Sequence, residues 1–111
     1  MFKIAKRIFL IALFGLLIGV AHSADKTLTW DANTETDLAG YKIYYAPIGI
    51  ETWTAVNVGN VTQYSRSALG ILEDGHNYYV TAYDTSGNES GPSNVIDDVS
   101  PSPPSGCRWL D

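Results

Sequence analysis

The pattern of hydrophobic and polar positions divides this chain near residue 23. Residues 8–20 are an unbroken apolar run that follows a short basic stretch, and small residues surround Ser23. As a helix the run would span about 20 Å, less than the roughly 30 Å of a bilayer's hydrocarbon core. The pattern predicts a signal peptide over residues 1–23, helical and cleaved after Ser23, with no stable membrane insertion afterwards. An uncleaved signal anchor is the alternative.

Beyond residue 23 the pattern is the period-two alternation of short β-strands. Tyr41 and Tyr45, for example, fall on one side of a strand, and Lys42 and Tyr44 fall on the other. Clusters of Gly, Pro, Asn and Ser separate the alternating stretches, as turns do. Six strands are expected, over residues 26–30, 41–46, 52–58, 61–69, 78–83 and 93–99. Six short strands at this spacing predict an all-β fold, an antiparallel immunoglobulin-like β-sandwich.

The same alternation sorts the aromatic residues into two groups. Trp30, Tyr41, Tyr45 and Tyr78 fall on inward positions and are expected in the core. The outward positions form a candidate binding face, made of Tyr44, Trp53, Tyr79 and Tyr83. Flat aromatic rings on a sheet face stack well on sugar rings or apolar peptide. The alternative is that these cross-strand aromatic pairs only stabilise the sheet.

Four short motifs, in order, resemble the fibronectin type III domain in its bacterial, secreted type. They are Leu28-Thr-Trp30-Asp, Gly40-Tyr41-Lys-Ile43, Leu72-x-x-Gly75-x-x-Tyr78 and the segment from Val80 to Asn94. The resemblance covers about residues 26–96. It implies that Trp30 is the core tryptophan and that Leu72 and Tyr78 form a tyrosine corner within the core, whose hydroxyl bonds the backbone across the turn. It also implies a module that binds a partner.

The sequence lacks the strand with which a fibronectin type III domain begins. In the family that strand pairs with the strand that carries Trp30, but only two residues separate Lys26 from the expected cleavage site. The first strand is therefore expected to be missing or vestigial, which leaves an open edge. A partner strand or a second copy could pair there. The alternative is a short, charged edge that stays soluble.

Charge and composition exclude several functions. Cleavage leaves four basic residues against twelve acidic ones, a net charge of −8, so nucleic acid is not an expected partner. The only histidine left is His76, and no nucleophile has a base beside it, so no enzyme is predicted. Residues 31–37 alternate oxygen-bearing side chains like a calcium loop but lack a central glycine. We expect an ordinary turn there, with no metal or cofactor.

Cys107 is the single cysteine and lies in a Pro-rich segment, residues 100–111, that is expected to be a flexible tail. It cannot close an internal disulfide, but it could pair between molecules.

The sequence predicts a signal peptide (1–23), a fibronectin type III-like domain (24–99) and this tail. We expect a secreted, extracellular module, or alternatively a periplasmic one, that binds an unknown protein or polysaccharide without catalysis. The alternative function is a structural or spacer component of an extracellular assembly. Its copies would self-associate through the open strand edge or an intermolecular disulfide of Cys107.

Overall fold

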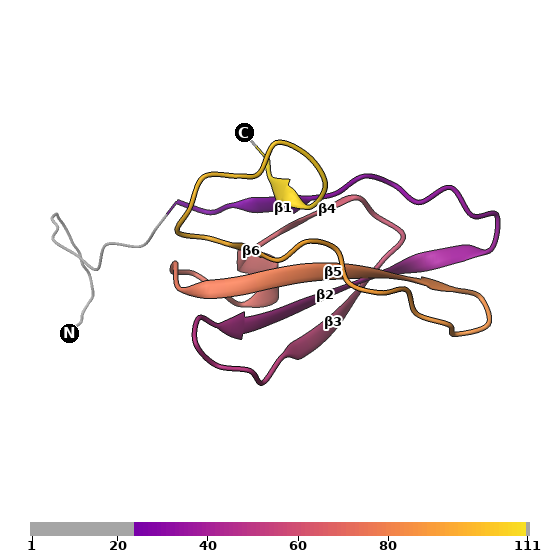
Figure 1. Ribbon diagram of the computed structural model, residues 1–111, viewed down its shortest axis with the longest axis horizontal. Helices are drawn as coiled ribbons and strands as arrows, with labels where there is room; N and C mark the ends of the chain where they lie inside the picture. Colours follow the sequence, from indigo (N-terminus) through magenta and orange to yellow (C-terminus); the bar gives the residue numbers. More distant parts are fainter. Residues whose placement is uncertain (1–23, 111) are drawn as a thin grey trace, which may run out of the picture.

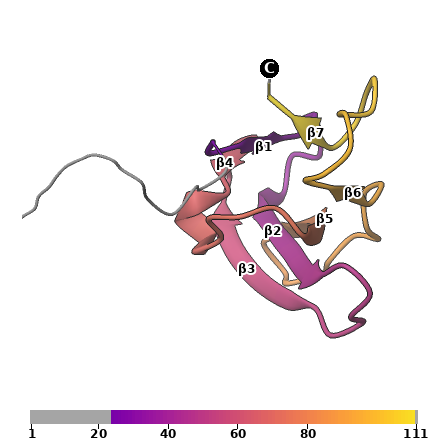
Figure 2. The same cartoon turned by 90° about the vertical axis from the view of Figure 1, so that its left-hand side faces the viewer.

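The computed structural model describes residues 24–110, and the predicted signal peptide lies outside these described residues. Within them, no helix is both long enough and apolar enough to cross a membrane. Seven strands form two antiparallel sheets that pack as two layers, seen along the strands in Figure 2. The predicted all-β sandwich is confirmed.

The smaller sheet has the order β4-β1-β7 and forms the upper layer in Figure 1. Its strands are β4 (Gln63–Ser65), β1 (Thr27–Thr29) and β7 (Arg108–Trp109). The larger sheet has the order β3-β2-β5-β6. Its strands are β3 (Thr54–Gly59), β2 (Leu38–Pro47), β5 (His76–Asp84) and β6 (Ile96–Asp97). A 3₁₀ turn, η1 (Ser67–Leu69), follows β4.

The two long strands β2 and β5 form the centre of the larger sheet, and both are longer than expected. β2 begins at Leu38, within the predicted loop, because a bulge between Leu38 and Gly40 lets the pairing with β5 continue to Asp84. A side chain at Gly40 would meet the Tyr83 hydroxyl at 2.7 Å and the Gly59 backbone at 2.9 Å. Glycine at position 40 therefore allows the close approach of three strands.

The other four predicted strands are shorter in the structure than expected, and two of them, over 61–69 and 93–99, are much shorter. The stretch 61–69 is divided into β4 and the η1 turn. The stretch 93–99 is reduced to the two residues of β6. On either side of β6, the N–H groups of Ser93 and Asp98 donate to the carbonyls of Val80 and His76 on β5, but these single hydrogen bonds do not form a continuous ladder. Hydrophobic alternation alone overestimated both strands.

The core lies between the two sheets. Trp30, Tyr41 and Tyr78 are buried in it, and the half-buried Tyr45 packs against it. Leu72 was predicted for the core, but this is wrong, since its side chain is 53% exposed. Gly70, with φ +86°, ends the η1 turn and redirects the chain, so the neighbouring Ile71 is buried instead.

The segment predicted to be a flexible tail is part of the sandwich. β7 pairs with β1, with Leu28 opposite Trp109 and Thr29 opposite Arg108. Cys107 is 1% exposed and Trp109 8% exposed. The expected domain boundary at residue 99 is therefore wrong.

The predicted open edge is corrected by the same observation. β4 pairs with one side of β1 and β7 with the other, so β1 is a central strand. β7 occupies the side of β1 where the resemblance would place its first strand.

Candidate functional site

The candidate site is the outer face of the larger sheet, where register brings aromatic side chains together. Tyr44 on β2 lies directly opposite Tyr79 on β5, and their rings stack with centroids 4.7 Å apart and an angle of 11°. Trp53, one residue before β3, meets Tyr79 at 4.8 Å and 62°. These three side chains are half-buried, so each keeps a solvent-facing part. Together with Tyr83 they form what we call the aromatic face.

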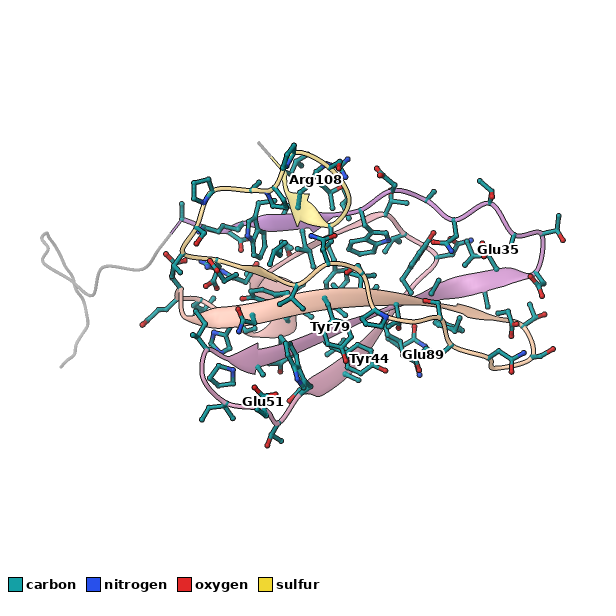
Figure 3. The ribbon with its side chains drawn as sticks, in the orientation of Figure 1. Glu35, Tyr44, Glu51, Tyr79, Glu89 and Arg108 are labelled. Carbon is teal, nitrogen blue, oxygen red and sulfur yellow. The ribbon has the colours of Figure 1, made fainter. Side chains whose placement is uncertain are left out.

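Glu89, from the loop after β5, folds back onto the aromatic face. Figure 3 shows it beside Tyr44 and Tyr79, away from Glu35 at the far end of the sandwich. Its carboxylate accepts hydrogen bonds from the Tyr44 hydroxyl and from Thr81 Oγ1, the latter at 2.7 Å. Lys42 Nζ lies 3.4 Å from the same carboxylate. Glu89 thus ties the β5–β6 loop to both central strands.

These contacts fix the ionisation of the aromatic face. The hydrogen bond to Glu89 raises the pKa of Tyr44 to about 12. The hydrogen bonds from Tyr44 and Thr81 lower the pKa of Glu89. At neutral pH the face therefore carries one carboxylate and one ammonium group, Lys42, which offset each other. A carboxyl group with a lowered pKa is poorly suited to act as a general acid.

The orientation of the rings decides which one can stack on a ligand. Tyr44 and Tyr79 cover one another's faces. Lys42 Nζ lies over the Tyr83 ring at 5.7 Å, and the Tyr83 hydroxyl donates to Asn57 Oδ1 at 2.9 Å. Trp53 meets Tyr79 at a steep angle instead of stacking on it, and no cation over its ring is found among the described residues. It is the ring best placed to receive an apolar ligand surface.

The acidic loop that resembles a calcium site lies elsewhere, at one end of the sandwich. A pocket of about 220 Å³ separates it from the β5–β6 loop, and Tyr83 and Glu89 at the near end of the aromatic face also line this pocket. Asp31 pairs with Arg108 at 3.1 Å, and the Asn33 N–H donates to the Tyr41 hydroxyl at 2.8 Å. Within residues 24–110, no three His, Cys, Asp or Glu side chains are grouped as metal ligands. The contacts observed in this loop hold it in place.

A buried ionic cluster lies at the opposite end of the sandwich, and no motif in the sequence predicts it. The Arg66 guanidinium is fully buried, with Nη1 2.6 Å from Asp74 Oδ1 and 3.2 Å from Asp98 Oδ2. The Tyr78 hydroxyl donates to Asp98 Oδ2 at 2.8 Å. The expected tyrosine-corner bond from Tyr78 to the backbone is therefore wrong, because the Asp98 carboxylate takes that hydroxyl. Hydrophobic alternation predicts that charged residues lie at the surface. It gives no information about which arginine and aspartate pair when both are buried.

Acid should unfold the protein through this cluster. Burial alone would raise the pKa of Asp98, but the N–H groups of Gly75 and His76, the Tyr78 hydroxyl and Arg66 outweigh burial and lower it. The hydrogen bond from Arg66 likewise lowers the pKa of Asp74. A carboxyl whose folded pKa lies below its unfolded value of about 3.9 stabilises the fold above that pH, and this stability is lost as the pH falls through the folded pKa.

We therefore expect the urea midpoint to hold steady from pH 7 to 5 and to fall steeply below about pH 4. The Asp98→Asn variant should start lower and fall less steeply, whereas Asp31→Asn, at an exposed carboxylate, should follow the wild type. A wild-type midpoint that does not change between pH 5 and 3 would contradict this role of the cluster.

Cys107 is not available for the predicted intermolecular disulfide in this structure. Its thiol is buried, and burial raises its pKa to about 11. The thiolate is the reactive form, so the buried thiol is protected from oxidation.

Comparison with known proteins finds a similarity to part of a larger enzyme. No family model matches the chain, and no solved structure matches it either. The chain is 33% identical over 84 residues to Exoglucanase B of Cellulomonas fimi. The match covers 74% of this chain but 7% of the exoglucanase, so the chain spans a small part of that protein's length. The chain is thus similar to one segment of an exoglucanase.

Proposed function

We propose that this chain is an exported, non-catalytic module of fibronectin type III type that binds an uncharged polysaccharide through its aromatic face. The observation that carries the proposal is the cluster of Trp53, Tyr79 and Tyr44 on one outer sheet face. The similarity to a segment of an exoglucanase supports a glucan as the ligand. Export, to the extracellular space or alternatively the periplasm, rests on the signal-like residues 1–23.

The shape and charge of the aromatic face favour an extended, neutral ligand. A sheet face is flat, whereas small molecules are usually held in concave pockets. Lys42 and Glu89 offset each other, so the face offers no net charge to attract an acidic polysaccharide or a basic peptide. The apolar face of a sugar ring can lie on Trp53 while its hydroxyl groups meet the neighbouring polar side chains.

The non-catalytic part of the proposal rests on the side chains around the face. Glu89 is held by three donors, and its lowered pKa keeps it ionised. His76 lies on β5 at the other end of the sandwich, near the Tyr45 and Tyr78 rings. These positions favour binding over acid–base chemistry.

The alternative function, a structural or spacer component, required copies of the chain to associate through an open edge of β1 or through a disulfide of Cys107. The side of β1 that was to accept a second strand is filled by β7, and the Cys107 thiol is buried. Neither contact is available in the described sandwich. The aromatic face therefore has the stronger support.

Replacing Trp53 by alanine should reduce binding to an insoluble uncharged glucan, such as cellulose, by about tenfold, equivalent to about 1.4 kcal/mol. The indole would supply most of the apolar contact, while the stacked tyrosines remain. Binding is measured by depletion of the protein from solution over a range of glucan concentrations.

The matched control for this experiment is Tyr64→Ala, which removes a half-buried aromatic from β4 on the other sheet. Circular dichroism shows whether both variants are folded. Equal binding by the wild type and Trp53→Ala, or no binding of the wild type to cellulose, would rule out the proposed function.

A further inference from the structure

The C-terminal residues 106–110, which we call the clasp, join the two sheets along one side of the sandwich. On the smaller sheet, the Leu110 N–H donates to the Thr27 carbonyl at 2.8 Å, next to the β1–β7 pairing. On the other side, the Asn94 side chain both donates to the Cys107 carbonyl and accepts from its N–H, each at 3.0 Å. Asn94 therefore pairs with the clasp as a strand residue would.

The clasp also fits its slot by shape. The Trp109 ring packs edge-on against Tyr78, with centroids 5.1 Å apart, and its Nε1 donates to the Asp97 carbonyl at 2.8 Å. Gly106 has φ +76°, and a side chain there would come within 2.8 Å of Asn94 Oδ1. The slot between β1 and residues 94–97 thus fits a glycine at position 106 and a tryptophan at position 109.

The connection that leads to the clasp, residues 99–105, is largely exposed and its hydrogen bonds are local. The N–H groups of Val99 and Ser100 donate to Asp97 Oδ1 at 2.9 Å and 2.7 Å. Val99, Ser100, Pro101, Pro104 and Ser105 are all exposed. Ser102 connects this stretch to the clasp, since its Oγ accepts a hydrogen bond from the backbone N–H of Trp109 at 3.1 Å. Prolines favour extended backbone and cannot donate a ladder hydrogen bond. This segment has the character of a hinge between a folded body and a specific strand.

We propose that the clasp is exchangeable, so that the clasp of one copy of this chain can occupy the slot of a second copy and form a symmetric dimer. Every contact of the clasp with its slot would be the same between two chains as within one, because exchange conserves the contacts and changes only the hinge. Because the hinge tethers the clasp to its own chain, the effective concentration of the clasp at its own slot is in the millimolar range. The closed monomer therefore dominates at micromolar concentration, and exchange becomes important where copies are crowded.

Two variants that each carry one introduced cysteine, on separate chains, test this exchange. Thr27→Cys and Leu110→Cys, each combined with Cys107→Ala, are mixed in equal amounts and treated with a short bismaleimide cross-linker. The two cysteines face each other only when the clasp of one chain enters the slot of the other. The fraction of chains in cross-linked heterodimers should rise about tenfold for each tenfold increase in concentration while dimers are the minor species.

Two controls set the upper and lower limits of the cross-linking yield. The double variant Thr27→Cys with Leu110→Cys, on one chain, should cross-link internally at every concentration, which shows that both positions react. A mixture of Ala55→Cys, on β3 of the other sheet, with Leu110→Cys gives the level of random collision. Deleting residues 101–104 shortens the hinge and should raise the exchanged fraction. Cross-linking of the Thr27–Leu110 mixture that never exceeds the Ala55–Leu110 level up to millimolar concentration would overturn the proposal.

Discussion

Replacing Arg66 by methionine lowers the free energy of unfolding by about 3–5 kcal/mol, because it leaves a buried carboxylate without its cation. Asp98 is fully buried and faces the Arg66 guanidinium at 3.2 Å. Arg66 Nη2 also donates to the Ala24 carbonyl at 3.1 Å, so the variant loosens the start of the folded domain as well. Small domains have total stabilities of roughly 5–15 kcal/mol, so the loss is a large part of the whole.

Urea unfolding followed by tryptophan fluorescence measures this loss. The control is Arg108→Met, which removes a cation paired with the exposed carboxylate of Asp31 and should cost about 0–1 kcal/mol of pairing energy. Adding Asp98→Leu to the Arg66 variant should restore stability only in part, since Asp98 also accepts the N–H groups of Gly75 and His76. An Arg66→Met variant within 1 kcal/mol of the wild type would show that the cluster is solvated in solution.

Replacing Trp109 by alanine is the second change with a large expected effect, a loss of about 3–5 kcal/mol. The Trp109 side chain is buried against Tyr78, and its removal would leave a cavity at the side of the sandwich and an unpaired carbonyl at Asp97. The same urea titration measures the effect.

The neighbouring Leu110→Ala variant is the matched control, because Leu110 is exposed and should change stability by no more than about 0.5 kcal/mol. If residues 100–110 were a flexible tail, both variants would unfold like the wild type. Equal midpoints for Trp109→Ala and Leu110→Ala would therefore contradict the packing of the clasp.

The central strands could be predicted from the sequence because alternation is strongest there. Tyr41 and Ile43 on β2, and Tyr78 and Val80 on β5, alternate with polar or aromatic outward residues over several positions. Long paired strands with one face buried leave little freedom in register. The register then brings Tyr44 opposite Tyr79, so the position of the aromatic face follows from the same pattern.

The parts that could not be predicted depend on short segments and on single charged residues. β7 has only two residues, too few for any period, and it follows a stretch of prolines that is typical of a tail. Its position depends on Trp109, Asn94 and Gly106, which are far apart or unremarkable in the sequence. Arg66 is buried because two carboxylates and the Ala24 carbonyl surround it, and hydrophobicity patterns carry no information about such partners.

The loop after β5 shows the same limit at the candidate site. The sequence placed Glu89 in a turn-rich stretch with no assigned role. In the structure a single bridge pairs Glu89 with Tyr83, and this places the carboxylate beside Tyr44 and Thr81. An isolated bridge of this kind leaves no signature in composition or alternation.

The most direct test of the proposed function is an NMR titration of the isotopically labelled protein with a soluble, uncharged glucan oligosaccharide. We predict shifts of the Trp53 indole N–H and of the backbone amides around Tyr44 and Tyr79, with little change along β1 and β4 on the other sheet. Shifts confined to the pocket between the loops at Glu35 and Asn88, or no shifts at millimolar oligosaccharide, would contradict binding at the aromatic face.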